Sequence, residues 1–148
     1  MSRGLSLCAV AAAQLALLAA ASVRAADDAA AQDFVLHCQG CHGVDAVGVP
    51  HKVPALRDTF PPLISIDAGR DFVMRVPGAA SSRLSDARLA AVLNWLAARY
   101  ASPAAAQHEF TAAEVGDGRS RPMAGVRAAR AAVAARLAER GTPLPLDY

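Results

Sequence analysis

Two cysteines and a histidine in the pentapeptide Cys38-Gln39-Gly40-Cys41-His42 are the residues of this 148-residue chain whose types and spacing suggest chemistry. Two thiols three positions apart can add to the two vinyl groups on one edge of a porphyrin and form thioethers. A histidine directly after the second thiol is then held under the iron as its proximal ligand. The pattern therefore predicts one covalently bound haem c, attached through Cys38 and Cys41 and ligated by His42.

The same residue types could also form a disulfide, a redox-active cysteine pair or a zinc site. A thioredoxin-like pair is typical of a βαβ context, and no segment of this chain alternates with the period of a strand. A structural zinc site needs a second pair of ligands, and the spacing of His37 and His51 suits no closed tetrahedral set. Haem attachment is therefore the favoured interpretation.

The elements that must position the pentapeptide are predicted to be helices, so the expected fold class is all-α. A helix over Asp27–Gln39 has acidic residues in its first turn, where they suit the helix dipole. The clearest helix begins at Ser85 or Asp86 and is ended by Pro103. Its large apolar side chains recur at helical spacing: Leu89, Val92, Leu93, Leu96 and Tyr100.

Between these two helices we expect a loop and a shorter helix. The stretch from Gly43 to Pro62 contains four prolines and two glycines, which indicates mostly loop. Asp67 is then expected to cap a helix over Ala68–Val76, which Pro77 stops.

Residues 103–148 are predicted to form a helical extension to a domain of residues 26–102. Thr111 to Glu114 has the pattern of a capping box, and the short turn that it starts is interrupted by Gly116, Gly118 and Pro122. Met123–Arg140 is rich in alanine and predicted to be a helix. Its apolar stripe is thin and consists of Val126, Val133 and Leu137.

Residues 1–25 have the order of regions that is typical of a secretory signal peptide. Arg3 precedes an apolar run from Leu5 to Val23, and small residues stand at the two positions before Ala26 that a signal peptidase recognises. Cleavage after Ala25 would deliver the mature chain to the periplasm. The alternative is an uncleaved membrane anchor, because the run is close to the length that spans a bilayer.

The mature chain is neutral overall but unevenly charged. Without Arg3 and Arg24 it holds 13 basic and 13 acidic residues, so its charge gives no argument for binding nucleic acid. Residues 119–140 contain six arginines and one glutamate, which makes this tail basic and the remainder acidic. The tail could dock on an acidic partner or on anionic lipid, but the spread of its arginines around the helix favours a solvated surface.

Several residues beyond the pentapeptide make this sequence resemble a small class I cytochrome c over Ala30–Tyr100. The helix leading into CQGCH, Gly43, the sequence Val53-Pro54-Ala55-Leu56 and the helix start Leu84-Ser85-Asp86 follow the family's order. The resemblance implies an all-α domain wrapped around a covalent haem. It also implies that the Pro54 carbonyl accepts a hydrogen bond from His42, that Leu56 packs on the haem face, and that the terminal helix with Trp95 crosses the first helix near Phe34.

The sixth iron ligand is the point at which this sequence departs from the family. Val76-Pro77 occupies roughly the place of the family's methionine, and Met74 lies two residues earlier. Met74 is the first candidate ligand, with a gap-filling core methionine as the alternative. Met123, a histidine such as His108, and an open or water-bound iron are the other possibilities.

The resemblance implies an exported carrier of single electrons between redox partner proteins and not an enzyme. Such a chain also resembles the electron-accepting subunit of a periplasmic dehydrogenase. The alternatives are a haem-based module that binds or senses a small molecule, and a subunit that docks on an oxidoreductase complex through its tail. Arg57, Arg70 and Arg75 are candidate partners of haem propionates, although each of them suits a solvated surface position as well.

Overall fold

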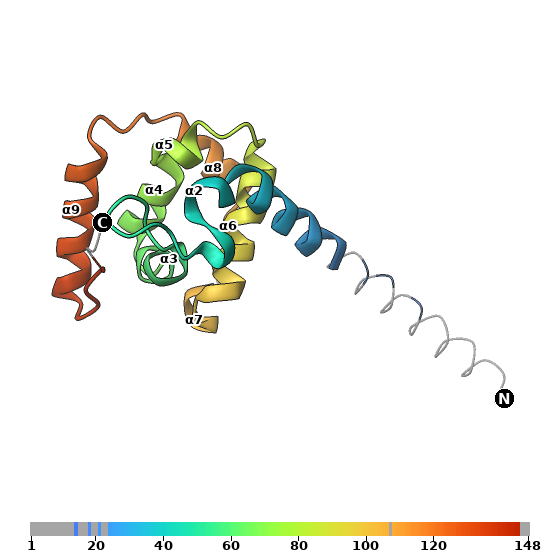
Figure 1. The fold of residues 1–148 in the computed structure, drawn as a ribbon, viewed down its shortest axis with the longest axis horizontal. Coiled ribbons are helices and arrows are strands. Elements are labelled where there is room, and N and C mark those ends of the chain that lie inside the picture. The colour runs from blue at the N-terminus through green and yellow to red at the C-terminus, as the bar shows by residue number, and fades with distance from the viewer. Residues whose placement is uncertain (1–13, 15–17, 19–20, 22–23, 107, 146–148) are drawn as a thin grey trace.

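The computed structural model describes residues 14, 18, 21, 24–106 and 108–145 (Figure 1). The described residues form helices joined by loops and contain no strand, so the expected all-α fold class is confirmed. Residues 24–37 are helical and are followed by α2 (Gln39–His42) and the 3-10 helix η1 (Val44–Ala46). Most of the predicted signal peptide lies outside the described residues. None of the helices within the described part of the chain is long and apolar enough to cross a membrane.

A nine-residue helix, α3 (Leu56–Ile64), occupies part of the stretch that was expected to be loop. The expectation of a loop holds for residues 43–55 apart from η1, and it fails from Leu56 onwards, where Pro61 and Pro62 lie inside the helix. Each proline removes one backbone N–H donor. The acceptors left without that donor belong to Arg57 and Asp58, which are exposed and can be hydrated. The opposite face buries four side chains, and this burial outweighs the lost hydrogen bonds: Thr59, Phe60, Leu63 and Ile64.

The next helices largely follow the predicted boundaries. Helix α4 (Asp67–Arg75) begins at Asp67, which lies in the first turn and is not the cap. Helix α5 (Pro77–Ala80) starts directly after Val76. Helix α6 (Asp86–Tyr100) is capped by Ser85, whose side chain accepts a hydrogen bond from the backbone N–H of Arg88.

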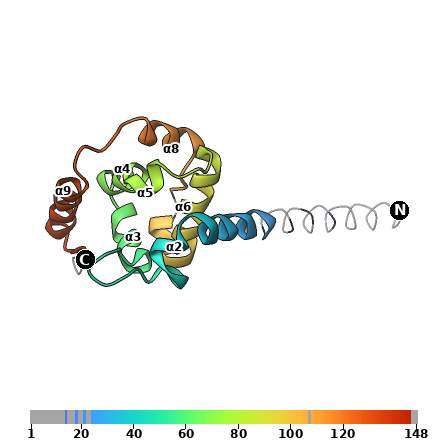
Figure 2. The ribbon, with the colours of Figure 1, turned by 45° about the horizontal axis from the view of Figure 1, so that its top comes forward.

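The N-terminal helix crosses α6 where the sequence predicts. The rings of Phe34 and Trp95 lie with their centroids 5.4 Å apart. Asp33 is buried beside them and forms an ion pair with Arg88 of α6. Residues 24–29 are exposed, so the helix contacts the body of the protein only from Ala30 onwards. In both ribbon views this helix projects from the side of the molecule opposite to α9 (Figures 1 and 2).

The C-terminal extension packs on the helices that precede it. After α7 (Pro103–Ala106), helix α8 (Ala112–Arg119) lies against α6 and α4. Helix α9 (Val126–Glu139) lies against α4 and α3, with Val133 and Leu137 buried and Val126 partly exposed. Side chains from both sides of position 103 belong to one buried apolar cluster, among them Leu93, Phe110 and Leu137.

Helix α8 continues through Gly116 and Gly118, where an interruption was expected. Both glycines face close neighbours: a Cβ atom at Gly116 would lie 2.9 Å from the Asp86 carboxylate, and one at Gly118 would lie 2.9 Å from the Cβ atom of Met74. The glycines therefore allow α8 to approach α6 and α4, and this packing outweighs their poor helix propensity. The expected cap is present, because Thr111 accepts a hydrogen bond from the backbone N–H of Glu114.

Candidate functional site

The two thiols and the imidazole of the pentapeptide are brought together by a single turn of backbone. The helix of residues 24–37 ends at Cys38, and α2 follows at once. The backbone N–H groups of Cys41 and His42 both donate to the Cys38 carbonyl oxygen, at 3.1 and 3.0 Å. Cys38 is half-buried and Cys41 exposed, and neither takes part in a disulfide. Both sulfur atoms are thus available for thioether formation.

The imidazole of His42 is oriented by a hydrogen bond to the loop that follows it. Its Nδ1 atom lies 3.1 Å from the carbonyl oxygen of Pro54, which is the contact that the resemblance implies. With Nδ1 donating to that carbonyl, Nε2 has the lone pair that can ligate a metal. Burial lowers the pKa of His42 from its ordinary value of 6.5, and the hydrogen bond to Pro54 acts in the opposite direction. The neutral form of the ring, which is the ligating form, is therefore favoured.

A tight loop places the Pro54 carbonyl beside His42. Val49 and Val53 exchange two backbone hydrogen bonds of 2.9 Å across an isolated bridge, so Pro54 follows directly after a closed turn. Gly48 donates its N–H to the His42 carbonyl at 2.7 Å and has a φ angle of +70°. A glycine is needed here because a Cβ atom would lie 2.4 Å from the Val53 carbonyl oxygen.

Large apolar side chains near the pentapeptide are exposed, which is unusual for their type. Exposed fractions range from 41% at Val49 to 72% at Leu36, and the set is Val35, Leu36, Val44, Val47 and Val49. Leu56, which the resemblance places on the haem face, is half-buried and packs against the apolar core. Two of these side chains precede the pentapeptide in the sequence and three follow it.

Met74 lies at the interface between helices α4 and α8. Its side chain is 3% exposed, and its Cβ, Cε and Sδ atoms all lie against Gly118. Met123 is half-buried and packs against the core, and His108 is exposed. The structure thus brings Cys38, Cys41, His42 and Pro54 together, and it buries Met74 in the apolar cluster beside Gly118.

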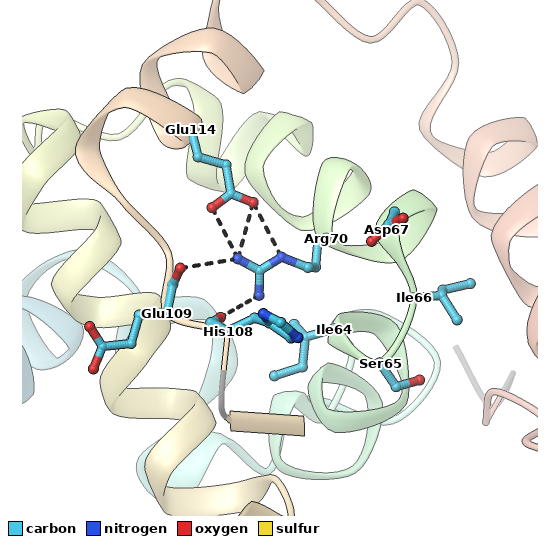
Figure 3. Close-up of a pocket in the computed structure, with 8 residues that line it drawn as sticks. All are labelled: Ile64, Ser65, Ile66, Asp67, Arg70, His108, Glu109 and Glu114. Carbon is cyan, nitrogen blue, oxygen red and sulfur yellow. Dashed lines mark hydrogen bonds and ion pairs between the residues drawn. The ribbon is translucent and has the colours of Figure 1, made fainter. Parts of the chain in front are cut away.

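No family model, characterised protein or solved structure matches this chain. Two hollows of about 560 and 530 Å³ are present elsewhere. The first lies around Arg70 and His108 (Figure 3), and the second lies along α9. Neither of them is lined by the pentapeptide.

Arginines that the sequence suggested as haem partners or solvated side chains have partners within the protein. The side chain of Arg70 is only 11% exposed, and its guanidinium bonds both carboxylate oxygens of Glu114 at 3.0 Å (Figure 3). The guanidinium also stacks 3.9 Å above the ring centre of Phe110. Arg75 donates to Asp71 and to the Arg121 carbonyl. Asp71 and Arg75 are related in the sequence by i,i+4 helical spacing, whereas no local pattern relates Arg70 to Glu114.

We expect Cys38 of the haem-free protein to react slowly with iodoacetamide until the solution is strongly alkaline. Burial, with smaller contributions from Asp33 and Cys41, raises the pKa of the Cys38 thiol from 9.0 to about 11. Because the thiolate is the reactive species, the alkylation rate should keep rising from pH 9 through pH 11. Peptide mass spectrometry after timed labelling measures this rate. In an Asp33→Asn variant, the midpoint of the curve of alkylation rate against pH should shift to lower pH. A wild-type midpoint at pH 9 would contradict the described burial of Cys38.

Proposed function

We propose that this protein carries one covalently bound haem c and exchanges single electrons with redox partner proteins in the periplasm. The observation that carries the proposal is the arrangement of His42. Its Nδ1 atom is held by Pro54, and two free thiols precede it on the same turn of backbone. A disulfide or a redox-active cysteine pair has no use for an imidazole oriented in this way. A cytochrome c-like fold, wrapped around the haem, is part of the proposal.

Each residue of the site has a distinct part in this function. The S–H groups of Cys38 and Cys41 would add across the two vinyl groups, so that each sulfur gains a bond to carbon and each hydrogen passes to the neighbouring vinyl carbon. Nε2 of His42 would ligate the iron, and Pro54 would fix the ring and increase its basicity. The haem would supply a reversible one-electron couple at its iron. No bond of a substrate changes, so we do not propose an enzyme.

Electrostatics favour a partner that docks without strong steering. The basic tail and the acidic body neutralise one another in part, because Arg119 pairs with Asp86 at 2.8 Å and Arg121 pairs with Asp71 at 2.7 Å. These arginines are already engaged within the protein. The other arginines of the tail are spread around the helix and not gathered on one face. We therefore favour recognition through the apolar surroundings of the pentapeptide over docking of the tail on anionic lipid.

The absorption spectrum of the protein in alkaline pyridine tests the proposal. The full gene, with its export signal, is expressed in a bacterium that matures c-type cytochromes. The wild-type protein should give the spectrum of a haem with two thioethers, and Cys41→Ala should give the shifted spectrum of one thioether or lose the haem. Cys8→Ala is the matched control, because Cys8 lies in the predicted signal peptide and should have no effect. A two-thioether spectrum from Cys41→Ala would contradict the proposal.

A further inference from the structure

The side chain of Met74 is held against α8 by close packing. A Cβ atom built on Gly118 would lie 2.9 Å from the Cβ atom of Met74 and 3.5 Å from its Sδ and Cε atoms. The thioether therefore fills the space that the missing side chain of Gly118 leaves between the two helices. With 3% of its surface exposed, Met74 is one of the buried residues of the apolar cluster.

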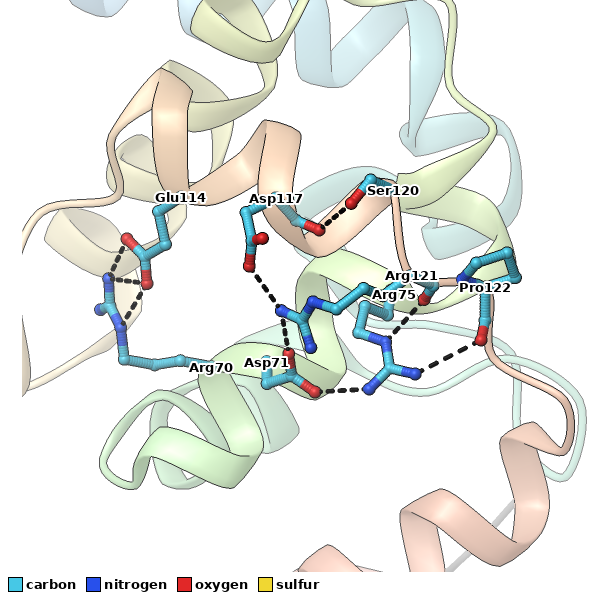
Figure 4. Close-up of polar contacts among 8 residues, drawn as sticks. All are labelled: Arg70, Asp71, Arg75, Glu114, Asp117, Ser120, Arg121 and Pro122. Atoms are coloured by element: carbon cyan, nitrogen blue, oxygen red, sulfur yellow. Dashed lines mark hydrogen bonds and ion pairs between the residues drawn. The ribbon is translucent and has the colours of Figure 1, made fainter.

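Polar contacts on both sides of Met74 fasten α4 to residues 108–122, which we call the C-terminal segment (Figure 4). Before Met74, Arg70 bonds the Glu114 carboxylate at 3.0 Å and the His108 carbonyl at 2.7 Å. After Met74, Arg75 donates to the Arg121 carbonyl at 2.8 Å. A movement of α4 away from α8 would have to break these contacts.

Asp71 adds a third point of attachment between α4 and the C-terminal segment. Its carboxylate pairs with Arg121 at 2.7 Å and with Arg75 at 2.7 Å (Figure 4). Burial works to raise the pKa of this carboxyl, but the hydrogen bonds from Arg75 and Arg121 outweigh it and lower the pKa from its ordinary value. Asp71 is therefore ionised at neutral pH, and the contact persists there.

The loop after α5 is held in the same way by one side chain of the C-terminal segment. The guanidinium of Arg119 donates to the carbonyl oxygens of Ala80, Ser82 and Leu84, at 2.7 to 3.0 Å. This loop contains no methionine or histidine. Of the described histidines other than His42, each is exposed: His37, His51 and His108.

From these contacts we infer that Met74 is a packing residue of the α4–α8 interface and that, of the described residues, His42 alone ligates the haem iron. The sixth coordination position would then be open to a small neutral diatomic ligand such as carbon monoxide. The inference depends on the proposed function, because it concerns the iron of the haem attached at Cys38 and Cys41. It adds ligand binding at that iron to the exchange of electrons.

Optical spectroscopy of the holoprotein tests the inference. Wild-type protein, Met74→Leu and Met123→Leu are compared, since leucine keeps most of the packing volume of methionine. The oxidised wild-type protein should lack the near-infrared band of methionine–ferric ligation, and the reduced protein should bind carbon monoxide on mixing. Both variants should have the wild-type spectrum and a carbon monoxide affinity within about twofold of wild type, because neither side chain is a ligand. A wild-type band that disappears in either variant would overturn the inference.

Oxidation of Met74 by chloramine-T, followed by peptide mass spectrometry, tests its burial independently of the iron. Met74 should be oxidised at least about tenfold more slowly than Met123 in wild-type protein, and the difference should shrink in Glu114→Gln, which loosens the C-terminal segment. Equal oxidation rates in wild-type protein would overturn the packing role. A protein without covalent haem would refute the proposed function and this inference together. A haem protein with a methionine band would refute the inference alone.

Discussion

Replacing Gly48 with alanine is expected to destabilise the protein by about 3 kcal/mol. The φ angle of Gly48 is +70°, a conformation that alanine adopts only at a cost. The new Cβ atom would also lie 2.4 Å from the Val53 carbonyl oxygen and 2.6 Å from the Ala55 nitrogen. These are backbone atoms, so relief requires the bridge before Pro54 to open. When the bridge opens, the hydrogen bond between His42 Nδ1 and the Pro54 carbonyl should weaken, and less haem should be attached.

Urea denaturation followed by the helical circular dichroism signal measures this loss of stability. Gly78→Ala is the matched control, because Gly78 lies in α5 and a Cβ atom there meets nothing within 4 Å. We expect the control to stay within about 0.5 kcal/mol of wild type. Equal stabilities for the two variants would show that the loop from Gly43 to Pro54 does not have the geometry described.

Removal of the Arg70 guanidinium is expected to destabilise the protein by about 2 kcal/mol. An Arg70→Met variant keeps much of the apolar stem but leaves the Glu114 carboxylate and the His108 carbonyl without their donor. The stacking on Phe110 is lost as well. The C-terminal segment should consequently become more susceptible to proteolysis than the rest of the protein.

Arg57→Met is the control for this prediction, because among the described residues Arg57 pairs only with its exposed neighbour Asp58. The Arg57 side chain is 48% exposed, and ion pairs of this kind contribute about 0.5 kcal/mol or less. The denaturation midpoints of the two variants, each compared with wild type, measure the difference between their losses of stability. A similarly small loss of stability in Arg70→Met and Arg57→Met would mean that the contact between α4 and α8 adds little to the stability of the protein.

Elements with strong local signals could be predicted from the sequence. The helix that begins after Ser85 was predicted because a hydroxyl cap precedes large apolar side chains at helical spacing. The prolines of α3 and the glycines of α8 misled the prediction because they are local signals of loops. In α3 the burial of Phe60 and Leu63 outweighs the cost of the prolines. In α8 the close approach to Met74 outweighs the poor helix propensity of the glycines.

The core of the candidate site was similarly accessible from the sequence, because its residues are neighbours. Cys38, Cys41 and His42 lie within five positions of one another, and the contact to Pro54 was implied by the resemblance to class I cytochromes c. The partner of Arg70 could not be predicted from the sequence. Glu114 lies 44 positions away, and no periodicity or cap relates the two residues. Only the packing of the extension on the preceding helices brings them together.

The mass of the purified periplasmic protein under denaturing conditions tests the central claim most directly. Covalent attachment adds one haem to the polypeptide, and thioethers survive acid and organic solvent. We predict a single species with the mass of the chain from Ala26 onwards plus one haem. The mass of the bare polypeptide, or of a polypeptide lacking two hydrogens because Cys38 and Cys41 have formed a disulfide, would contradict the account.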